Sequence, residues 1–214
     1  MVSLSDGDVH ISIRRGMNLA VEECLDRGLQ FFHVSPTPEL MPGRVVSKHY
    51  KSRPHYELFR EPPRRQFARI ARFPSDRRLE AAFEQVRQEV AAEAPSRKSA
   101  IFTFLCWECA VWFRDQAPER RGGTIFRFRP SQDSTIFVTD LIWRNVAANV
   151  LLRDGWRDPS FPFPAETQDE ALNAVARAYW TGENPESLGL GSRPEALIDG
   201  EVVPERCDER RCSN

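Results

Sequence analysis

The chain has 214 residues, of which 41% are hydrophobic and 29% are charged, and its formal net charge is −1. This length allows one domain with a buried core, and this composition excludes a disordered tail. No apolar run approaches the roughly 20 residues of a membrane-spanning helix, and the N-terminus carries no secretion signal. We therefore expect a cytoplasmic, bacterial-type protein without a membrane partner.

Apolar spacing and turn residues predict most of the secondary structure. The expected elements, in chain order, are a short helix over 16–28, a strand over 29–36, a helix over 76–94 with Ser75 as N-cap, a strand over 99–105, a helix over 107–113, strands over 124–130 and 134–140, helices over 144–152 and after Thr167, and a hairpin over 195–203 turning at Asp199-Gly200. Thr167 and Glu170 form a predicted capping box. Phe126 and Phe128 alternate with two arginines, as in a strand with one buried face.

Strands and helices do not alternate strictly in this list. The pattern predicts an α+β fold with a curved, mostly antiparallel sheet and flanking helices. We divide the chain into an N-terminal extension over 1–28, a domain over 29–204 with a basic loop and helix insertion over 44–95, and a charged tail over 205–214.

A basic segment lies in the first half of the chain. Between Arg44 and Arg78 there are eleven Lys and Arg residues against three acidic residues. Such an excess is typical of a solvated surface, and it is also typical of a surface that binds nucleic acid or another phosphate-bearing partner. Charge alone does not separate these two interpretations.

The five cysteines are odd in number and irregular in spacing, which argues against a disulfide scaffold. Cys106 and Cys109 form a CxxC motif, but no second CxxC or histidine pair stands at zinc-finger spacing. We expect both side chains to pack as small apolar groups. The alternative is a metal or redox role.

Four segments in a common order resemble the ADP-ribosyltransferase fold, and within it the small rifampin-modifying ADP-ribosyltransferases. They are FFHVSPTPELMPGRVV at 31–46, IFTFLCWECAVW at 101–112, GGTIFRFRP at 122–130 with VTD at 138–140, and YWTGENPESLGLGSRPEALIDGEVV at 179–203. The chain also resembles an uncharacterised bacterial family associated with the same fold. The resemblance implies a split sheet whose cleft binds NAD and breaks its nicotinamide–ribose bond through an oxocarbenium-like state, without a metal.

The same resemblance implies roles for individual residues. His33 would contact the nicotinamide ribose, and Phe102 stands where the family has a stacking tyrosine. Glu195 is favoured as the catalytic carboxylate, with Asp140 as the alternative. Arg97 would pair with the pyrophosphate. The remaining cofactor-binding positions are Ser35, Ser99 and Trp107.

Four of these residues also have a structural interpretation. His33 could be a hydrogen-bonded structural histidine, Glu195 an exposed strand-end carboxylate, Asp140 a helix N-cap and Arg97 a surface ion pair. The expected function is a toxin-like or modifying ADP-ribosyltransferase that acts on an unidentified protein, nucleic-acid or small-molecule acceptor. The alternative is a catalytically degenerate module of the same fold that holds a nucleic acid or protein on its basic surface.

Overall fold

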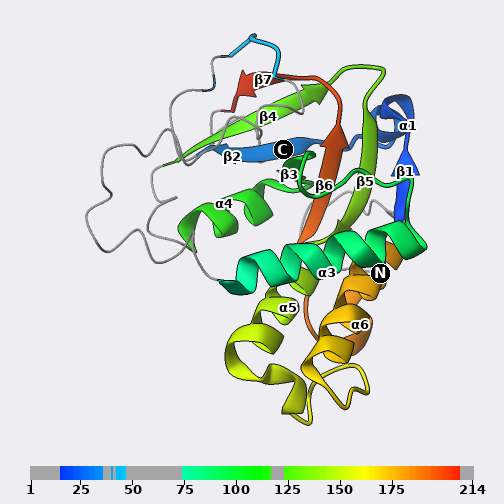
Figure 1. Ribbon diagram of the computed structural model, residues 1–214. Coiled ribbons are helices and arrows are strands. Elements are labelled where there is room, and N and C mark those ends of the chain that lie inside the picture. The colour runs from blue at the N-terminus through cyan, green and yellow to red at the C-terminus, as the bar shows by residue number, and fades with distance from the viewer. Residues whose placement is uncertain (1–14, 36–39, 41, 47–73, 117–122, 208–214) are drawn as a thin grey trace.

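The computed structural model describes residues 15–35, 40, 42–46, 74–116 and 123–207 (Figure 1). These residues form an α+β fold with a seven-stranded antiparallel sheet and flanking helices, which confirms the expected class. The strands are β1 Met17–Leu19, β2 Phe31–Ser35, β3 Ile101–Phe104, β4 Thr124–Pro130, β5 Thr135–Asp140, β6 Pro194–Asp199 and β7 Val202–Arg206. The helices are α1 Val21–Asp26, α3 Pro74–Val90, α4 Trp107–Asp115, α5 Leu141–Arg153 and α6 Gln168–Thr181, with 3-10 turns η4 Gly155–Arg157 and η5 Pro185–Leu188.

The strands lie in the order β1-β5-β6-β3-β2-β4-β7, and every neighbouring pair is antiparallel. Strand pairing is weakest between β2 and β3, near the middle of the sheet. A single registered pair, Phe32 with Phe104, joins β2 to β3, whereas four pairs join β3 to β6 and five join β2 to β4. The sheet therefore consists of two well-paired halves that meet at the β2–β3 junction.

The connection from β6 to β7 shows that the sheet is strongly curved. Only Gly200 and Glu201 separate these strands, although β3, β2 and β4 lie between them in the sheet. Figure 1 shows the chain passing directly from the end of β6 into β7, which crosses beside β4. A Cβ at Gly200 would lie 2.2 Å from the Ser134 Oγ, so a side chain is excluded where this turn packs on the β4–β5 connection.

Helices cover the sheet unequally. On one face, α3, α5 and α6 enclose the largest apolar cluster, whose fully buried rings include Phe83, Trp143 and Trp180. Helix α4 packs beside them against β2 and β3 through Ala110. The opposite face holds a second cluster, to which α1 contributes Cys24. Figure 1 shows α3, α5 and α6 together on one side and α1 near β1.

Most predicted elements are present. The strands at 29–36, 99–105, 124–130 and 134–140 are confirmed as β2 to β5, and Thr167 and Glu170 form the predicted capping box of α6. The alternation in β4 is confirmed as well, because Phe126 and Phe128 are buried while the two arginines are exposed.

Three local predictions are wrong. Residues 16–28 do not form one helix, because β1 pairs with β5 before α1 begins; this part of the expected extension is an edge of the sheet. Helix α3 begins at Pro74, so Ser75 is not its N-cap. The Asp199-Gly200 turn does not close a hairpin, because β6 pairs with β3 and β5 while β7 pairs with β4. None of the helices described here is both long and apolar enough to cross a bilayer.

Candidate functional site

The most distinctive polar group of the described residues is a buried cluster centred on Arg97. Its guanidinium binds the Glu195 carboxylate, with Nη1 3.2 Å from Oε1, and it also donates to the Tyr179 hydroxyl. Tyr179 in turn donates to the same Oε1 at 2.8 Å. Glu80 binds the other side of the guanidinium, with its Oε2 3.2 Å from Nε. The cluster thereby joins α3, α6 and β6 to the loop before β3.

Aromatic rings surround the same guanidinium. The Arg97 Cζ lies 4.7 Å from the ring centre of Phe102, 4.9 Å from that of Tyr179 and 5.4 Å from that of Phe83. Cation–π attraction is strongest where water is excluded, and Arg97 is only 6% exposed. The rings therefore help to offset the cost of burying this charge.

Burial and charge act in opposite directions on the cluster. Burial alone would lower the pKa of Arg97, but the carboxylates of Glu80 and Glu195 raise it above its ordinary value, so the guanidinium stays charged. Burial raises the pKa of Glu195 above its ordinary value, and the attraction of Arg97 only partly opposes this. Arg97 shares its charge with Glu80, so it compensates the Glu195 carboxylate incompletely. Burial also raises the pKa of the Tyr179 phenol, which donates its hydrogen bond as a neutral group.

The two oxygens of the Glu195 carboxylate have different surroundings. Both of its hydrogen bonds end on Oε1. Within the part of the chain that the structure describes, no hydrogen bond reaches Oε2. Glu195 is 2% exposed, so it is not the exposed strand-end carboxylate of the alternative interpretation. The carboxylate is positioned through one oxygen and keeps the other for a further donor.

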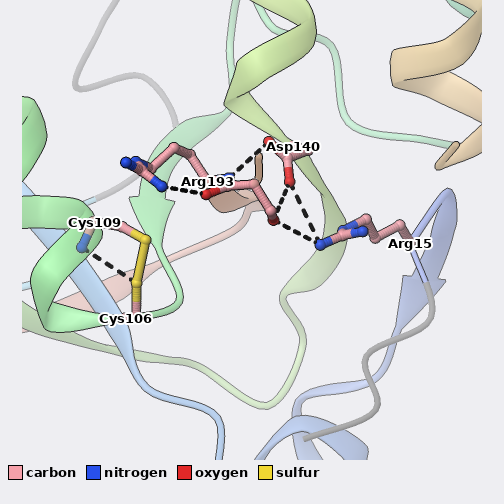
Figure 2. Close-up of a disulfide and its surroundings, with 6 residues drawn as sticks. Arg15, Cys106, Cys109, Asp140 and Arg193 are labelled. Atoms are coloured by element: carbon pink, nitrogen blue, oxygen red, sulfur yellow. Dashed lines mark hydrogen bonds and ion pairs between the residues drawn. A yellow bond between two sulfur atoms is a disulfide. The ribbon is translucent and has the colours of Figure 1, made fainter. Parts of the chain in front are cut away.

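Asp140 is used differently. It is the N-cap of α5, where its Oδ1 accepts from the backbone N–H groups of Ile142 at 3.0 Å and Arg193 at 2.9 Å. Its Oδ2 accepts from Ser192 at 2.6 Å and lies 3.5 Å from a guanidinium nitrogen of Arg15 (Figure 2). Both oxygens are engaged, as the N-cap interpretation predicts.

His33 lies at the junction of the two half-sheets. Its Nδ1 donates to the Phe102 carbonyl oxygen at 2.8 Å, and its ring stacks on Phe128 with centres 4.8 Å apart. The structural interpretation is thereby supported, since a carbonyl accepts and the Nδ1 must carry the proton. The histidine bridges β2 and β3 next to their single registered pair.

The predicted site residues fall on two faces of the sheet. Side chains alternate along a strand, and the β2–β3–β6 register places His33 and Ser35 on the face of Ala196. Phe102 and Glu195 project to the other face, where Arg97 contacts both. The structure thus brings Glu195, Arg97 and Phe102 together and separates them from His33.

Two further predicted positions lie outside this cluster. Trp107 is the first residue of α4, where its ring meets that of Phe32 edge-on at 5.7 Å. Ser99 lies in the loop before β3, and its backbone N–H donates to the Ser96 carbonyl at 3.1 Å. Arg97 forms a buried ion pair and not the surface pair of the alternative interpretation.

Two members of the cluster, Tyr179 and Glu80, are not among the residues predicted from the sequence. Tyr179 is one of the buried residues of α6, and a fully buried tyrosine needs a hydrogen-bond partner for its hydroxyl. The sequence therefore indicates that the Tyr179 hydroxyl has a hydrogen-bond partner, but it does not indicate that the partner is Glu195.

The prediction that Cys106 and Cys109 pack as separate apolar side chains is wrong, because a disulfide joins them. Cys207 is also disulfide-bonded. Among the described residues, no group of three or more His, Cys, Asp or Glu side chains is arranged to hold a metal ion.

Most of the basic segment lies outside the described residues. At its C-terminal end, the exposed Arg78 binds Asp169 through Nη2 at 2.5 Å and Gln168 through Nη1 at 2.7 Å. This arginine is engaged with the start of α6, and the charge excess itself is a property of the sequence.

A scan against protein families finds no match, and a search of curated proteins finds none.

Proposed function

We propose that the chain is an ADP-ribosyltransferase that cleaves the nicotinamide–ribose bond of NAD and transfers ADP-ribose to an acceptor. The observation that carries the proposal is the Glu195 carboxylate. It is buried at the start of β6, held through Oε1, and has no hydrogen bond to Oε2 from the described residues. A buried acid with a perturbed pKa is typical of a functional site.

The chemistry requires a carboxylate more than any other group. As nicotinamide departs, positive charge develops on the ribose, and a fixed carboxylate stabilises it in a water-excluded site. Glu195 is better suited than Asp140, because both oxygens of Asp140 are already engaged by helix α5, Ser192, Arg193 and Arg15. The proposal therefore assigns Glu195 as the catalytic carboxylate and Asp140 to positioning the start of α5.

The strands of the resemblance are neighbours in the sheet, which supports the proposal further. The matching segments contribute β5, β6, β3, β2 and β4, which lie in this order without interruption. His33 lies on the opposite face of the sheet from Glu195, so the proposal does not assign it the ribose contact. The basic segment from Arg44 to Arg78 is the candidate surface for a nucleic-acid acceptor.

The test is nicotinamide release from NAD by the purified chain, with and without cell extract as a source of acceptor. Glu195→Gln keeps the size of the side chain and its acceptor oxygen but removes the charge, so release should fall at least about 100-fold, on the scale of losing one transition-state charge contact. Glu201→Gln, at an exposed position just after β6, is the matched control and should retain wild-type release. Equal release by all three proteins would reject Glu195 as the catalytic carboxylate.

A degenerate binding module of the same fold is the second candidate. The observation that favours it is the Arg97 guanidinium, which lies 4.7 Å from the centre of the Phe102 ring and covers the ring that would stack on nicotinamide. Calorimetric titration with NAD separates the candidates, because a degenerate module releases no nicotinamide even with extract present. A salt-dependent gel shift with DNA or RNA would then identify nucleic acid as its partner.

A further inference from the structure

The Cys106–Cys109 disulfide closes the first turn of α4. Cys106 is the N-cap residue, and the Cα atoms of the two cysteines are 5.4 Å apart. The Cys106 Sγ also accepts a hydrogen bond from the Cys109 backbone N–H at 3.2 Å (Figure 2). The disulfide therefore lies within the first turn of α4, and the Cys109 backbone N–H of that turn points at the Cys106 sulfur.

The two sulfurs differ in accessibility. Cys106 is half-buried, whereas Cys109 is only 7% exposed and lies within the cluster that α4 forms with Phe32 and Phe104. An incoming thiolate must approach a disulfide sulfur directly, so access selects Cys106 as the attacked atom. Cys109 is then the leaving group, protected inside the cluster.

The surroundings favour a thiolate at Cys106. The N-terminus of a helix carries partial positive charge, and CxxC cysteines placed there have lowered pKa values. Arg193, the residue before β6, also contacts α4, because its Cζ lies 5.0 Å from the centre of the Trp112 ring. The backbone holds these segments together, since the Leu105 N–H donates to the Pro194 carbonyl at 3.2 Å. Glu108, the acidic residue of this turn, is exposed, where water screens its charge.

We propose that Cys106 and Cys109 form a redox-active site that exchanges electrons with thiols through Cys106. In the reductive direction, the thiolate of a donor thiol attacks the Cys106 Sγ and the Cys106–Cys109 bond breaks. Cys109 leaves as a thiolate and takes up a proton, and a second donor thiolate then attacks the donor sulfur of the mixed disulfide and releases Cys106. Two thiols become one disulfide, and the protein gains two electrons and two protons. This activity is independent of the proposed NAD chemistry.

Cys24 provides an internal reference for thiol reactivity. It is fully buried on the other face of the sheet, and burial raises the pKa of its thiol to about 11. It should stay unreactive while the protein is folded, so fast labelling reports on other cysteines.

The test uses the full chain equilibrated in glutathione buffers that range from oxidising to strongly reducing. After acid trapping and alkylation, mass spectrometry measures the modified fraction of the peptide that contains Cys106 and Cys109. We expect the ratio of modified to unmodified peptide to rise reversibly with the square of the reduced glutathione concentration divided by the oxidised glutathione concentration, while Cys24 stays unmodified. A disulfide that stays closed in the folded protein at a thousandfold excess of reduced over oxidised glutathione would overturn the proposal, because it would then be a structural crosslink.

Single variants test which sulfur reacts. With oxidised glutathione, Cys109→Ser should form the mixed disulfide at Cys106 at least tenfold faster than Cys106→Ser forms it at Cys109. Equal rates would reject Cys106 as the exchanging sulfur. Circular dichroism checks that both variants fold. If either does not, the position of glutathione trapped on the wild-type peptide decides the same question: Cys106 supports the proposal and Cys109 overturns it.

Discussion

Replacing Arg97 tests the energetics of the buried cluster. Arg97→Met keeps most of the side-chain volume but leaves the Glu195 carboxylate, 2% exposed, without its cation. Breaking a buried pair by removing one partner costs about 3–5 kcal/mol. For a chain of this size, that corresponds to a melting temperature lower by about 6–20 °C. The control Arg127→Met removes an exposed pair with Glu205 and should cost at most about 1 kcal/mol.

The stability lost in Arg97→Met should depend on pH. Burial already raises the pKa of Glu195 in the folded protein, and removing Arg97 removes the attraction that opposes this rise. A carboxyl whose folded pKa exceeds its unfolded value stabilises the fold below the unfolded value, and this contribution is lost as the pH rises through the folded pKa. The difference between wild type and Arg97→Met should therefore shrink as the pH falls from about 7.5 toward about 5, where protonation of Glu195 becomes easier.

The assay is urea unfolding of wild type, Arg97→Met, Glu195→Gln and the double variant at both pH values. The double variant contains no uncompensated carboxylate at this position, so it should recover part of the stability lost by Arg97→Met, with a coupling energy of about 0.5–3 kcal/mol. A pH-independent loss together with strict additivity would refute the assignment of the cost to a stranded Glu195 charge.

Three further predictions concern the elements that position the site. Thr167→Ala removes the α6 capping box with Glu170 and should lower the free energy of unfolding by about 1 kcal/mol, as measured by urea denaturation. Gly200→Ala places a Cβ 2.2 Å from the Ser134 Oγ and 2.8 Å from its Cα, so its melting temperature should fall below that of Gly189→Ala, whose Cβ meets no atom within 4 Å; equal melting temperatures would show that the turn adapts. Asp140→Asn retains an acceptor for α5, so it should melt above Asp140→Ala and turn over NAD in proportion to its folded fraction; a complete loss of turnover in a folded Asp140→Asn would assign Asp140 a catalytic role.

The local pattern of the sequence predicted individual elements better than their connections. The capping box at Thr167 and the alternation of Phe126 with Arg127 depend on neighbouring residues, and both are confirmed. The Asp199-Gly200 turn is also locally typical of a hairpin. Its strands nevertheless pair with other partners, because the sheet curves back on itself and long-range pairing overrides the local signal.

The candidate site shows the same limit. Glu195 and Arg97 were identified separately, but a loop and a strand 98 residues apart bring them into contact. No local motif singles out Tyr179, whose hydroxyl forms hydrogen bonds with both members of the pair. The N-cap role of Asp140 could be predicted because it depends on the next two residues. The placement of His33 and Glu195 on opposite faces of the sheet could not, because it depends on the register of β2, β3 and β6.

The most direct test of the proposed function is nicotinamide release from NAD by wild type and Glu195→Gln, measured as a function of pH. An ionised Glu195 should be required, so wild-type release should rise with pH through a pKa above the ordinary glutamate value, consistent with the raised pKa of this buried carboxyl. Folded Glu195→Gln should release nicotinamide at least about 100-fold more slowly at every pH. Wild-type release by the folded variant, or no release by wild type with any extract, would contradict the account.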